Sequence, residues 1–179
     1  MIAIVDYGAG NLFSVKNALE FLHVENWITA NPTDLAKADG IILPGVGAFR
    51  DAMTMLTRSG FAEAIKEQVA EKKPLFGICL GMQMLFEKGY EFGETPGLGL
   101  IPGCVQRMDA GTLKIPHVGW NDLTVLHPCV VSEGTQNGDF VYFVHSYRAE
   151  TEEKYISCYT TYHERIPALV WKENVYGAQ

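Results

Sequence analysis

The sequence lacks the cysteine patterns of a metal-binding or disulfide-bonded protein. Its four cysteines, at positions 79, 104, 129 and 158, include no pair at Cys-x-x-Cys spacing. That spacing is typical of zinc sites and redox pairs, so neither is predicted, and we expect no bound metal. Disulfide bonds are not expected either, because the sequence begins without a secretory signal.

Long apolar runs and an excess of positive charge are also missing. No uninterrupted apolar stretch approaches the length that crosses a bilayer. Lysine and arginine number 14 against 21 acidic residues, which leaves a net charge of −7. A negative surface disfavours nonspecific binding to nucleic acids and to anionic membranes. We therefore expect a soluble, cytoplasmic protein whose partners are neither nucleic acids nor membranes.

The first half of the sequence alternates strands and helices in the way that is typical of a parallel sheet. The strands are apolar without alternation, which indicates helices on both faces. In chain order we expect a strand at Ile2–Asp6, a helix at Leu12–Leu22, a strand near Ile28, a short helix or turn at Asp34–Ala38, a strand at Gly40–Leu43, a helix at Arg50–Lys72 broken near Ser59-Gly60, a strand from Pro74, and a helix from Gly81 to Glu87 capped by Gly89. This order predicts a flavodoxin-like, doubly wound, mostly parallel α/β sheet.

The second half predicts antiparallel strands added to this core. Thr95–Gly103 is rich in glycine and proline and reads as a loop, and Gln136–Asp139 has the composition of a tight turn. Short alternating or aromatic runs lie at Val105–Met108, Asp122–Val125, Val141–Val144, Tyr155–Thr160 and Ala168–Trp171. Because there is no repeat and no linker, we expect a single domain over residues 1–179.

Cys79 stands between two glycines where a predicted strand meets a predicted helix. Gly77-x-Cys79-x-Gly81 is the thiol form of a nucleophile elbow, a sharp turn that exposes the reactive side chain. Amides and the dipole at the start of a helix favour the thiolate. The amide of Leu80 is also placed to stabilise an oxyanion on the substrate. A small buried apolar residue is the alternative for Cys79, but the flanking glycines favour a nucleophile.

Two further glycine turns follow predicted strands. Gly8-Ala9-Gly10 resembles part of a dinucleotide fingerprint, but Phe13 replaces the third glycine and no acidic residue ends the next strand. Nucleotide binding is therefore not predicted, and we expect no cofactor. Gly45-Val46-Gly47 can turn its amides toward a ligand, although a plain tight turn would have the same sequence. In a parallel sheet these turns and the elbow fall on one rim, where ligands bind.

Several blocks together resemble a known family. Pro44–Gly47, Gly77–Gln83 and His145-Ser146-Tyr147 resemble the signature blocks of class I (triad-type) glutamine amidotransferases. Asp6–Asn11 and Pro116–Asn121 resemble, within that family, the glutaminase subunits of imidazole glycerol phosphate synthases. The resemblance runs from the first residue to the last, with the blocks in the family's order and spacing.

The resemblance implies an activity and a set of site residues. Cys79 would attack the side-chain amide of L-glutamine and release ammonia, and water would then cleave the thioester to give glutamate. The oxyanion hole would be formed by amides of Leu80 and of Val46 and Gly47. The residues implied to bind the substrate are Gly45, Gln83, Ser146 and Tyr147.

The resemblance also implies a partner. In this family the ammonia passes to a (β/α)8-barrel cyclase subunit of histidine biosynthesis, which forms a heterodimer with the glutaminase. The positions that match the interface are Asn11, Ser14, Trp120 and Tyr142. For Trp120 and Tyr142 a place in the core is the alternative. An amidotransferase of another synthase and an inactive relative that only binds the partner stay open as alternative functions.

One part of the family pattern is not present. The family completes its triad with a histidine and a glutamate in a Phe-His-Pro-Glu block, directly after a strand that ends in Gly-x-Gln. The sequence ends at Gly177-Ala178-Gln179. We therefore expect the triad histidine and glutamate to lie beyond Gln179, in a C-terminal end that the domain lacks here. None of the five histidines is expected to replace the base, so residues 1–179 alone are not expected to turn glutamine over.

Overall fold

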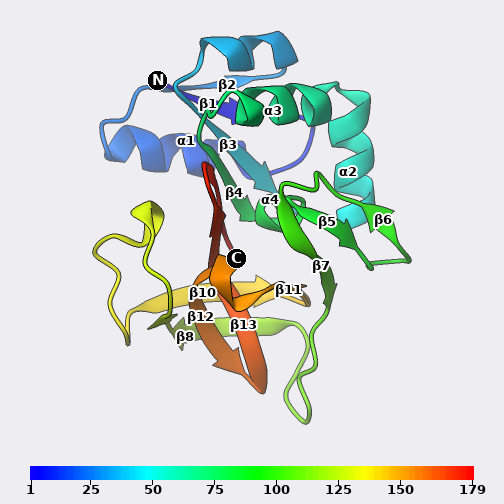
Figure 1. Cartoon of the computed structure of the whole chain (residues 1–179), viewed down its shortest axis with the longest axis vertical. Helices are drawn as coiled ribbons and strands as arrows, with labels where there is room; N and C mark the ends of the chain where they lie inside the picture. The colour runs from blue at the N-terminus through cyan, green and yellow to red at the C-terminus, as the bar shows by residue number, and fades with distance from the viewer.

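The central sheet contains eight strands in the order β2-β1-β3-β4-β14-β13-β12-β9 (Figure 1). The computed structural model covers residues 1–179 without a gap. Neighbouring strands are parallel from β2 to β14 and antiparallel from β14 to β9. The bounds are Asn26–Thr29 (β2), Ile2–Val5 (β1), Gly40–Gly45 (β3), Leu75–Cys79 (β4), Val175–Ala178 (β14), Glu164–Lys172 (β13), Ile156–Tyr162 (β12) and Thr124–Val125 (β9). The predicted mostly parallel α/β sheet with antiparallel additions is confirmed.

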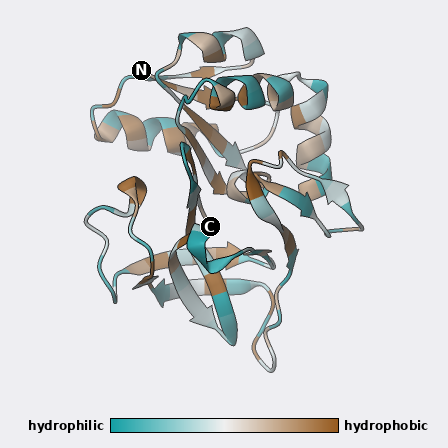
Figure 2. Ribbon diagram, viewed as in Figure 1, coloured by the Kyte–Doolittle hydropathy of each residue, from teal (hydrophilic) through white to brown (hydrophobic).

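The main core lies between the parallel strands and three of the four helices, α2, α3 and α4, whose bounds are given below. Alternate strand residues such as Val5, Leu43 and Leu75 are fully buried and pack with Phe49 and Phe61 in one cluster of 26 residues. Figure 2 shows the hydrophobic colour concentrated along these strands. The helices are α1 (Leu12–Phe21), α2 (Phe49–Arg58), α3 (Phe61–Ala70) and α4 (Leu80–Gln83), with 3-10 turns at Pro32–Lys37, Val130–Ser132 and Glu153–Tyr155.

The break predicted near Ser59-Gly60 is confirmed. Gly60 has a φ of 81°, a left-handed conformation that glycine adopts without strain and that ends one helix before the next begins. On the other face of the sheet, helix α1 has no buried residue. It lines a shallow apolar groove together with Ile42, Phe76 and Ile78 of the strands.

The helix predicted from Gly81 to Glu87 is wrong beyond its first turn. Helix α4 ends at Gln83, and Phe86–Gly89 forms strand β5, which pairs with a later strand. Met82, Met84, Leu85 and Phe86 are all fully buried, and a run that is buried on every side has no periodicity to separate helix from strand. Gly89 caps no helix, because it pairs within the sheet.

The second half adds two smaller sheets, one below the parallel strands in Figure 1 and one that runs from the right of their lower ends downward. One pairs β10 with β8, and the other has the order β11-β7-β5-β6. The bounds of these strands are Phe140–His145 (β10), His117–Asp122 (β8), Tyr147–Glu150 (β11), Ile101–Arg107 (β7), Phe86–Gly89 (β5) and Thr95–Pro96 (β6).

Three details of this half differ from the prediction. The strand expected at Asp122–Val125 is two strands, β8 and β9, and β11 was not predicted. The loop expected at Thr95–Gly103 contains β6 and the start of β7. Strand β14, for which no pairing was predicted, is parallel to β4 and lies inside the central sheet. Apolar runs as short as these do not record which strand each one pairs with.

None of the helices combines the length and the apolar character that a membrane span requires.

Candidate active site

The three predicted glycine turns lie on one rim of the sheet. Strands β1, β3 and β4 are parallel neighbours, and Gly45, the last residue of β3, pairs in register with Cys79 at the end of β4. Ligands of parallel sheets bind at these carboxyl ends. The rim therefore places Cys79 beside the Gly45-Val46-Gly47 turn, as the sequence predicted.

The elbow around Cys79 depends on direct packing of backbone on backbone. Cys79 itself has a φ of 55° and a ψ of −114°, a conformation that costs a non-glycine residue on the order of 1–3 kcal/mol. A Cβ on Gly81 would lie 1.8 Å from the Leu43 carbonyl oxygen, and one on Gly45 would lie 2.6 Å from the Gly81 nitrogen. A Cβ on Gly77 would lie 2.7 Å from the Gly81 carbonyl. Only glycine fits at these three positions.

Burial and hydrogen-bond donors act on the Cys79 thiol in opposite directions. Burial raises its pKa above the ordinary value, while the Leu80 N–H and the Gln179 side chain lower it to a smaller extent. The first amide of the helix thus lowers the Cys79 pKa as expected, but burial outweighs it. Helix α4 has only four residues, so few peptide dipoles add up at its start. The Leu80 amide faces the Cys79 sulfur, so it lies next to the position where an oxyanion would form on a substrate bound to Cys79.

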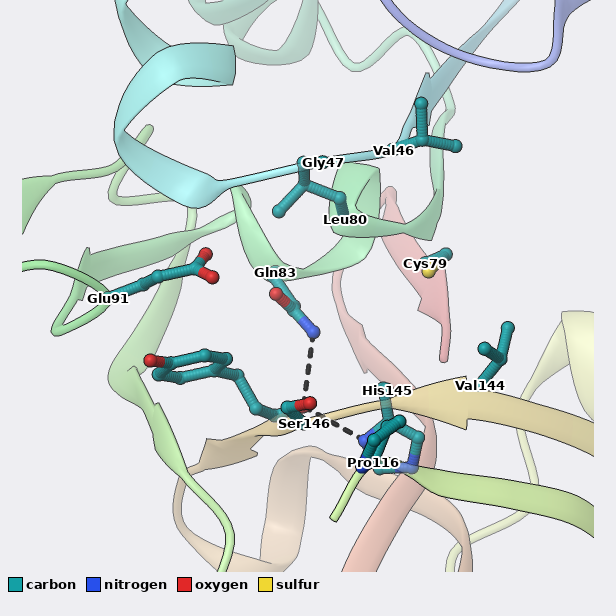
Figure 3. Close-up of a pocket in the computed structure, with 11 residues that line it drawn as sticks. Val46, Gly47, Cys79, Leu80, Gln83, Glu91, Pro116, Val144, His145 and Ser146 are labelled. Carbon is teal, nitrogen blue, oxygen red and sulfur yellow. Dashed lines mark hydrogen bonds between the residues drawn. The ribbon is translucent and has the colours of Figure 1, made fainter.

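A cavity of about 380 Å³ opens over Cys79. Figure 3 shows Val46 and Leu80 on one side of it and the segment around His145 on the other. The lining residues are Val46, Gly47, Cys79, Leu80, Gln83, Glu91, Pro116, Val144, His145, Ser146 and Tyr147. Of the predicted catalytic and substrate-binding residues, only Gly45 does not line the cavity, because it packs beneath α4.

Gln83 connects the two sides of the cavity. Its side-chain Nε2 donates to the Tyr147 carbonyl at 3.2 Å and to the Gln179 Oε1 at 2.8 Å. The Gln179 Nε2 in turn donates to the Cys79 Sγ at 3.6 Å. Gln179 was not predicted as a site residue, although it is the glutamine of the Gly-x-Gln pattern noted in the sequence.

His145 is the histidine that lines the cavity, and both of its ring nitrogens are engaged. Its Nδ1 lies 3.0 Å from the Tyr147 carbonyl oxygen, and its Nε2 lies 3.0 Å from the Nδ1 of the fully buried His117. Burial and the neighbouring His117 lower the pKa of His145 to about 4. No hydrogen bond joins a histidine to Cys79 in the structure, and the Cys79 sulfur accepts from the Gln179 Nε2 instead.

Glu91 is a site residue that the sequence did not reveal. It is the one carboxylate that lines the cavity, and its Oε2 accepts a hydrogen bond from the Phe49 amide at 2.8 Å. That amide begins helix α2, where an acceptor stabilises free N–H groups. Glu91 lies in a turn without any motif, so only the folded chain brings it to the site.

The predicted interface residues are all at the surface. Trp120 and Tyr142 are 66% and 52% exposed, so the alternative of core aromatics is wrong. Their rings meet edge to face at 5.6 Å, one from each strand of the β8–β10 pair. Asn11 and Ser14 are exposed at the start of α1, where the Asn11 side chain accepts from the Ser14 amide at 3.3 Å.

No group of three or more histidine, cysteine, aspartate or glutamate side chains is placed to hold a metal ion.

Comparison with known proteins identifies a family model and relatives that match the whole chain. Residues 3–179 match the family model described as glutamine amidotransferase class-I. The chain is 48% identical to imidazole glycerol phosphate synthase subunit HisH of Shouchella clausii, over all of its own length and 88% of that protein. It is 45% identical to imidazole glycerol phosphate synthase subunit HisH 1 of Campylobacter jejuni, over all of its length and 90% of the relative.

Solved structures agree on the fold. A crystal structure described as a glutamine amidotransferase superposes with a TM-score of 0.77 at 21% identity, covering 99% of this chain and 88% of the other. PurLQS from Thermotoga maritima has the same TM-score, 0.77, at 22% identity, covering 99% of this chain and 85% of its own. At such identities the likeness concerns the fold alone. With the full-length family match and the relatives near half identity, the chain belongs to the class I glutamine amidotransferase family.

Proposed function

We propose that this protein is the glutaminase subunit of an imidazole glycerol phosphate synthase. In this role it hydrolyses L-glutamine to glutamate and ammonia and passes the ammonia to a (β/α)8-barrel cyclase in histidine biosynthesis. Proteins named as subunits of that synthase match the whole chain at 43% to 48% identity. The observation that carries the proposal is Cys79, held in a strained elbow at the floor of a cavity and flanked by backbone amides.

The chemistry assigned to the site follows from these groups. The Cys79 thiolate attacks the side-chain carbonyl carbon of glutamine, and the oxygen becomes negatively charged. The Leu80 amide and an amide of the Val46–Gly47 turn stabilise this oxyanion, and one such donor contributes on the order of 10²–10³ in rate. The C–N bond then breaks, and the leaving nitrogen takes up, by way of the base, the proton that the Cys79 thiol gave up and departs as ammonia. Water attacks the resulting thioester, releases glutamate and restores the Cys79 thiol.

The opposite side of the cavity suits the amino-acid end of the substrate. Glutamine carries an α-ammonium and an α-carboxylate, which need an anion and hydrogen-bond donors. Glu91 supplies the negative charge, and the Ser146–Tyr147 segment supplies backbone groups. We assign Gln83 to holding that segment in place, because its amide already donates to Tyr147. Gly45 contributes by letting α4 approach β3 closely.

The proton of the Cys79 thiol needs an acceptor, since burial raises its pKa. His145 does not fit this role, because it is a weak base and uses both nitrogens in other hydrogen bonds. The assignment of the base to a histidine–glutamate pair of the family type stays a prediction.

The exposed face of the β8–β10 pair suits the partner. Large apolar side chains that stand in water favour association, and aromatic residues carry much of the energy at protein interfaces. The exposed apolar residues of this face are Val118, Trp120, Phe140, Tyr142 and Val144. We assign this face, together with Asn11 and Ser14, to the cyclase.

Cys79 substitutions test the function. Cys79→Ala should remove glutamate release in the presence of the cyclase subunit while leaving the fold and the binding of the cyclase unchanged. A chloroketone analogue of L-glutamine should label Cys79 before the other three cysteines. Cys104→Ala is the matched control, because Cys104 lies on β7 away from the cavity. Even labelling of all four cysteines would contradict the proposal.

A further inference from the structure

We propose that His117 is a positioning residue for the glutamine pocket, which fixes His145 and thereby the Tyr147 carbonyl opposite Cys79. The inference rests on the proposed function for the identity of the ligand. It concerns a residue that lines no part of the cavity. His117 lies on β8 and pairs in register with His145 on β10.

The β8–β10 pair has two different faces. Val118, Trp120 and Tyr142 point outward and are more than half exposed, whereas His117 is fully buried and His145 is 6% exposed on the other face. Successive residues of a strand point to opposite faces, so one short stretch of backbone carries both the exposed side chains and the buried histidines. The pocket residues Ser146 and Tyr147 follow directly after His145.

A continuous chain of hydrogen bonds leads from β8 to the nucleophile. The Asn121 Oδ1 accepts from the His117 Nε2 at 2.7 Å, and the His117 Nδ1 lies 3.0 Å from the His145 Nε2. His145 and Gln83 both reach the Tyr147 carbonyl, at 3.0 and 3.2 Å, as the dashed lines in Figure 3 show. Gln83 then meets Gln179, and Gln179 meets the Cys79 sulfur.

The direction of these bonds follows from the chemistry of the partners. A carbonyl oxygen only accepts, so the Nδ1 of His145 carries a proton and donates to Tyr147. In the neutral ring the Nε2 of His145 is then an acceptor, so His117 must donate from its Nδ1. The Asn121 Oδ1 is an acceptor as well, so His117 meets both partners by donating from both of its ring nitrogens. His117 therefore selects the one His145 tautomer that can hold the Tyr147 carbonyl.

His117 is itself held firmly. Its ring stacks on Tyr162 with centroids 4.0 Å apart and on Phe143 with centroids 5.0 Å apart, both within 20° of parallel. Two stacked rings and two hydrogen bonds leave it a single orientation. Any shift of β8 that moves this ring must change the donor that faces His145, and with it the Ser146–Tyr147 segment.

The test distinguishes the effect of losing the His117 N–H donor from the effect of losing its ring. His117→Phe keeps a stacked ring and removes the donor, whereas His117→Asn keeps an N–H near the position of Nδ1 and loses the ring. Asp122→Asn, an exposed change on the same strand, is the control. For each variant, Cys79 is labelled with the chloroketone analogue of L-glutamine over a range of concentrations, and separately with iodoacetamide.

We expect His117→Phe to raise the half-saturating concentration of the analogue about tenfold, as for one lost hydrogen bond to a pocket group. The iodoacetamide rate should change less than about twofold, and the Asn and control variants should stay close to the wild type. Equal half-saturation for His117→Phe and the wild type would overturn the inference, as would an equal loss in His117→Asn. Wild-type labelling without saturation would instead overturn the proposed function.

A measurement on the unmodified protein is independent of both labelling and variant folding. Nitrogen NMR of the imidazole rings should show His145 protonated at Nδ1 and His117 protonated at Nδ1. A His145 ring protonated only at Nε2 would overturn the inference whatever the ligand is.

Discussion

The two walls of the cavity are held by different kinds of interaction. The first, the glycine wall, consists of Gly45, Gly77 and Gly81 around Cys79, where backbone touches backbone with no room for a methyl group. The second, the histidine wall, is the His145–Tyr147 segment, held by side-chain hydrogen bonds that begin at His117. Close-packed backbone has no alternative arrangement, whereas hydrogen-bonded side chains can exchange partners. The reactive group is thus placed in the rigid wall, and the face proposed for the partner belongs to the adjustable one.

The largest effect should come from adding one methyl group to the glycine wall. Gly81→Ala places a Cβ 1.8 Å from the Leu43 carbonyl oxygen, so β3 and α4 must separate. We expect a loss of at least about 3 kcal/mol in the free energy of unfolding, measured with urea. Gly138→Ala is the control, since that glycine also has a positive φ, of 92°, but no atom within 4 Å. It should lose only about 1–2 kcal/mol; similar losses in both variants would mean that the wall is not rigid.

A smaller effect, on binding rather than stability, should come from the outer face of the histidine wall. Trp120→Ala and Tyr142→Ala remove exposed rings, so the free energy of unfolding should change by less than about 0.5 kcal/mol. Binding of the cyclase, followed by calorimetric titration, should weaken about 30-fold, which corresponds to about 2 kcal/mol. Phe21→Ala, at an 83% exposed residue of α1, should leave it unchanged. Equal weakening at Phe21 would place the interface elsewhere.

Gln83, which links the two walls, should contribute about 1–2 kcal/mol to the free energy of unfolding. Gln83→Leu keeps the volume of a buried residue but removes its hydrogen bonds to Tyr147 and Gln179. We expect that loss in unfolding experiments, together with weaker binding of the glutamine analogue. Gln68→Leu is a matched control, because Gln68 is equally buried and its Oε1 has no partner. Substitution there should be neutral or stabilising, and a cost equal to that at Gln83 would show that the link contributes nothing.

The smallest effect concerns the pH at which Cys79 reacts. Its thiol pKa is raised by burial, so the thiolate population at neutral pH is below that of a free thiol. Alkylation by iodoacetamide should rise about tenfold per pH unit and keep rising past pH 9, where a free thiol levels off. Gln179→Leu removes a donor that lowers this pKa and should move the curve to slightly higher pH. A plateau below pH 8 would mean that the donors at the start of α4 outweigh burial.

The glycine wall could be predicted from the sequence, whereas the histidine wall could not. Gly77, Cys79 and Gly81 lie within five residues, and parallel strands bring the turn at Gly45 to the same rim, so local pattern and topology suffice. The pairing of His117 with His145 depends on the register of two strands that are 28 positions apart, and no periodicity records it. Glu91 and strand β5 were missed for the same reason, since only the folded chain decides what a buried run or a turn residue faces.

Strand β14 has a consequence for the synthesis of the protein. It follows every other strand of the sheet in sequence, yet it lies between β4 and β13 in the middle of the sheet. During translation β4 therefore stays an open edge, with unpaired amides and carbonyls next to the elbow, until residues 175–179 leave the ribosome. Residue Gln179, which bonds to Gln83 and to the Cys79 sulfur, arrives at the same moment. A nascent chain thus carries its nucleophile long before it carries a pocket, and it is then most exposed to mispairing and aggregation.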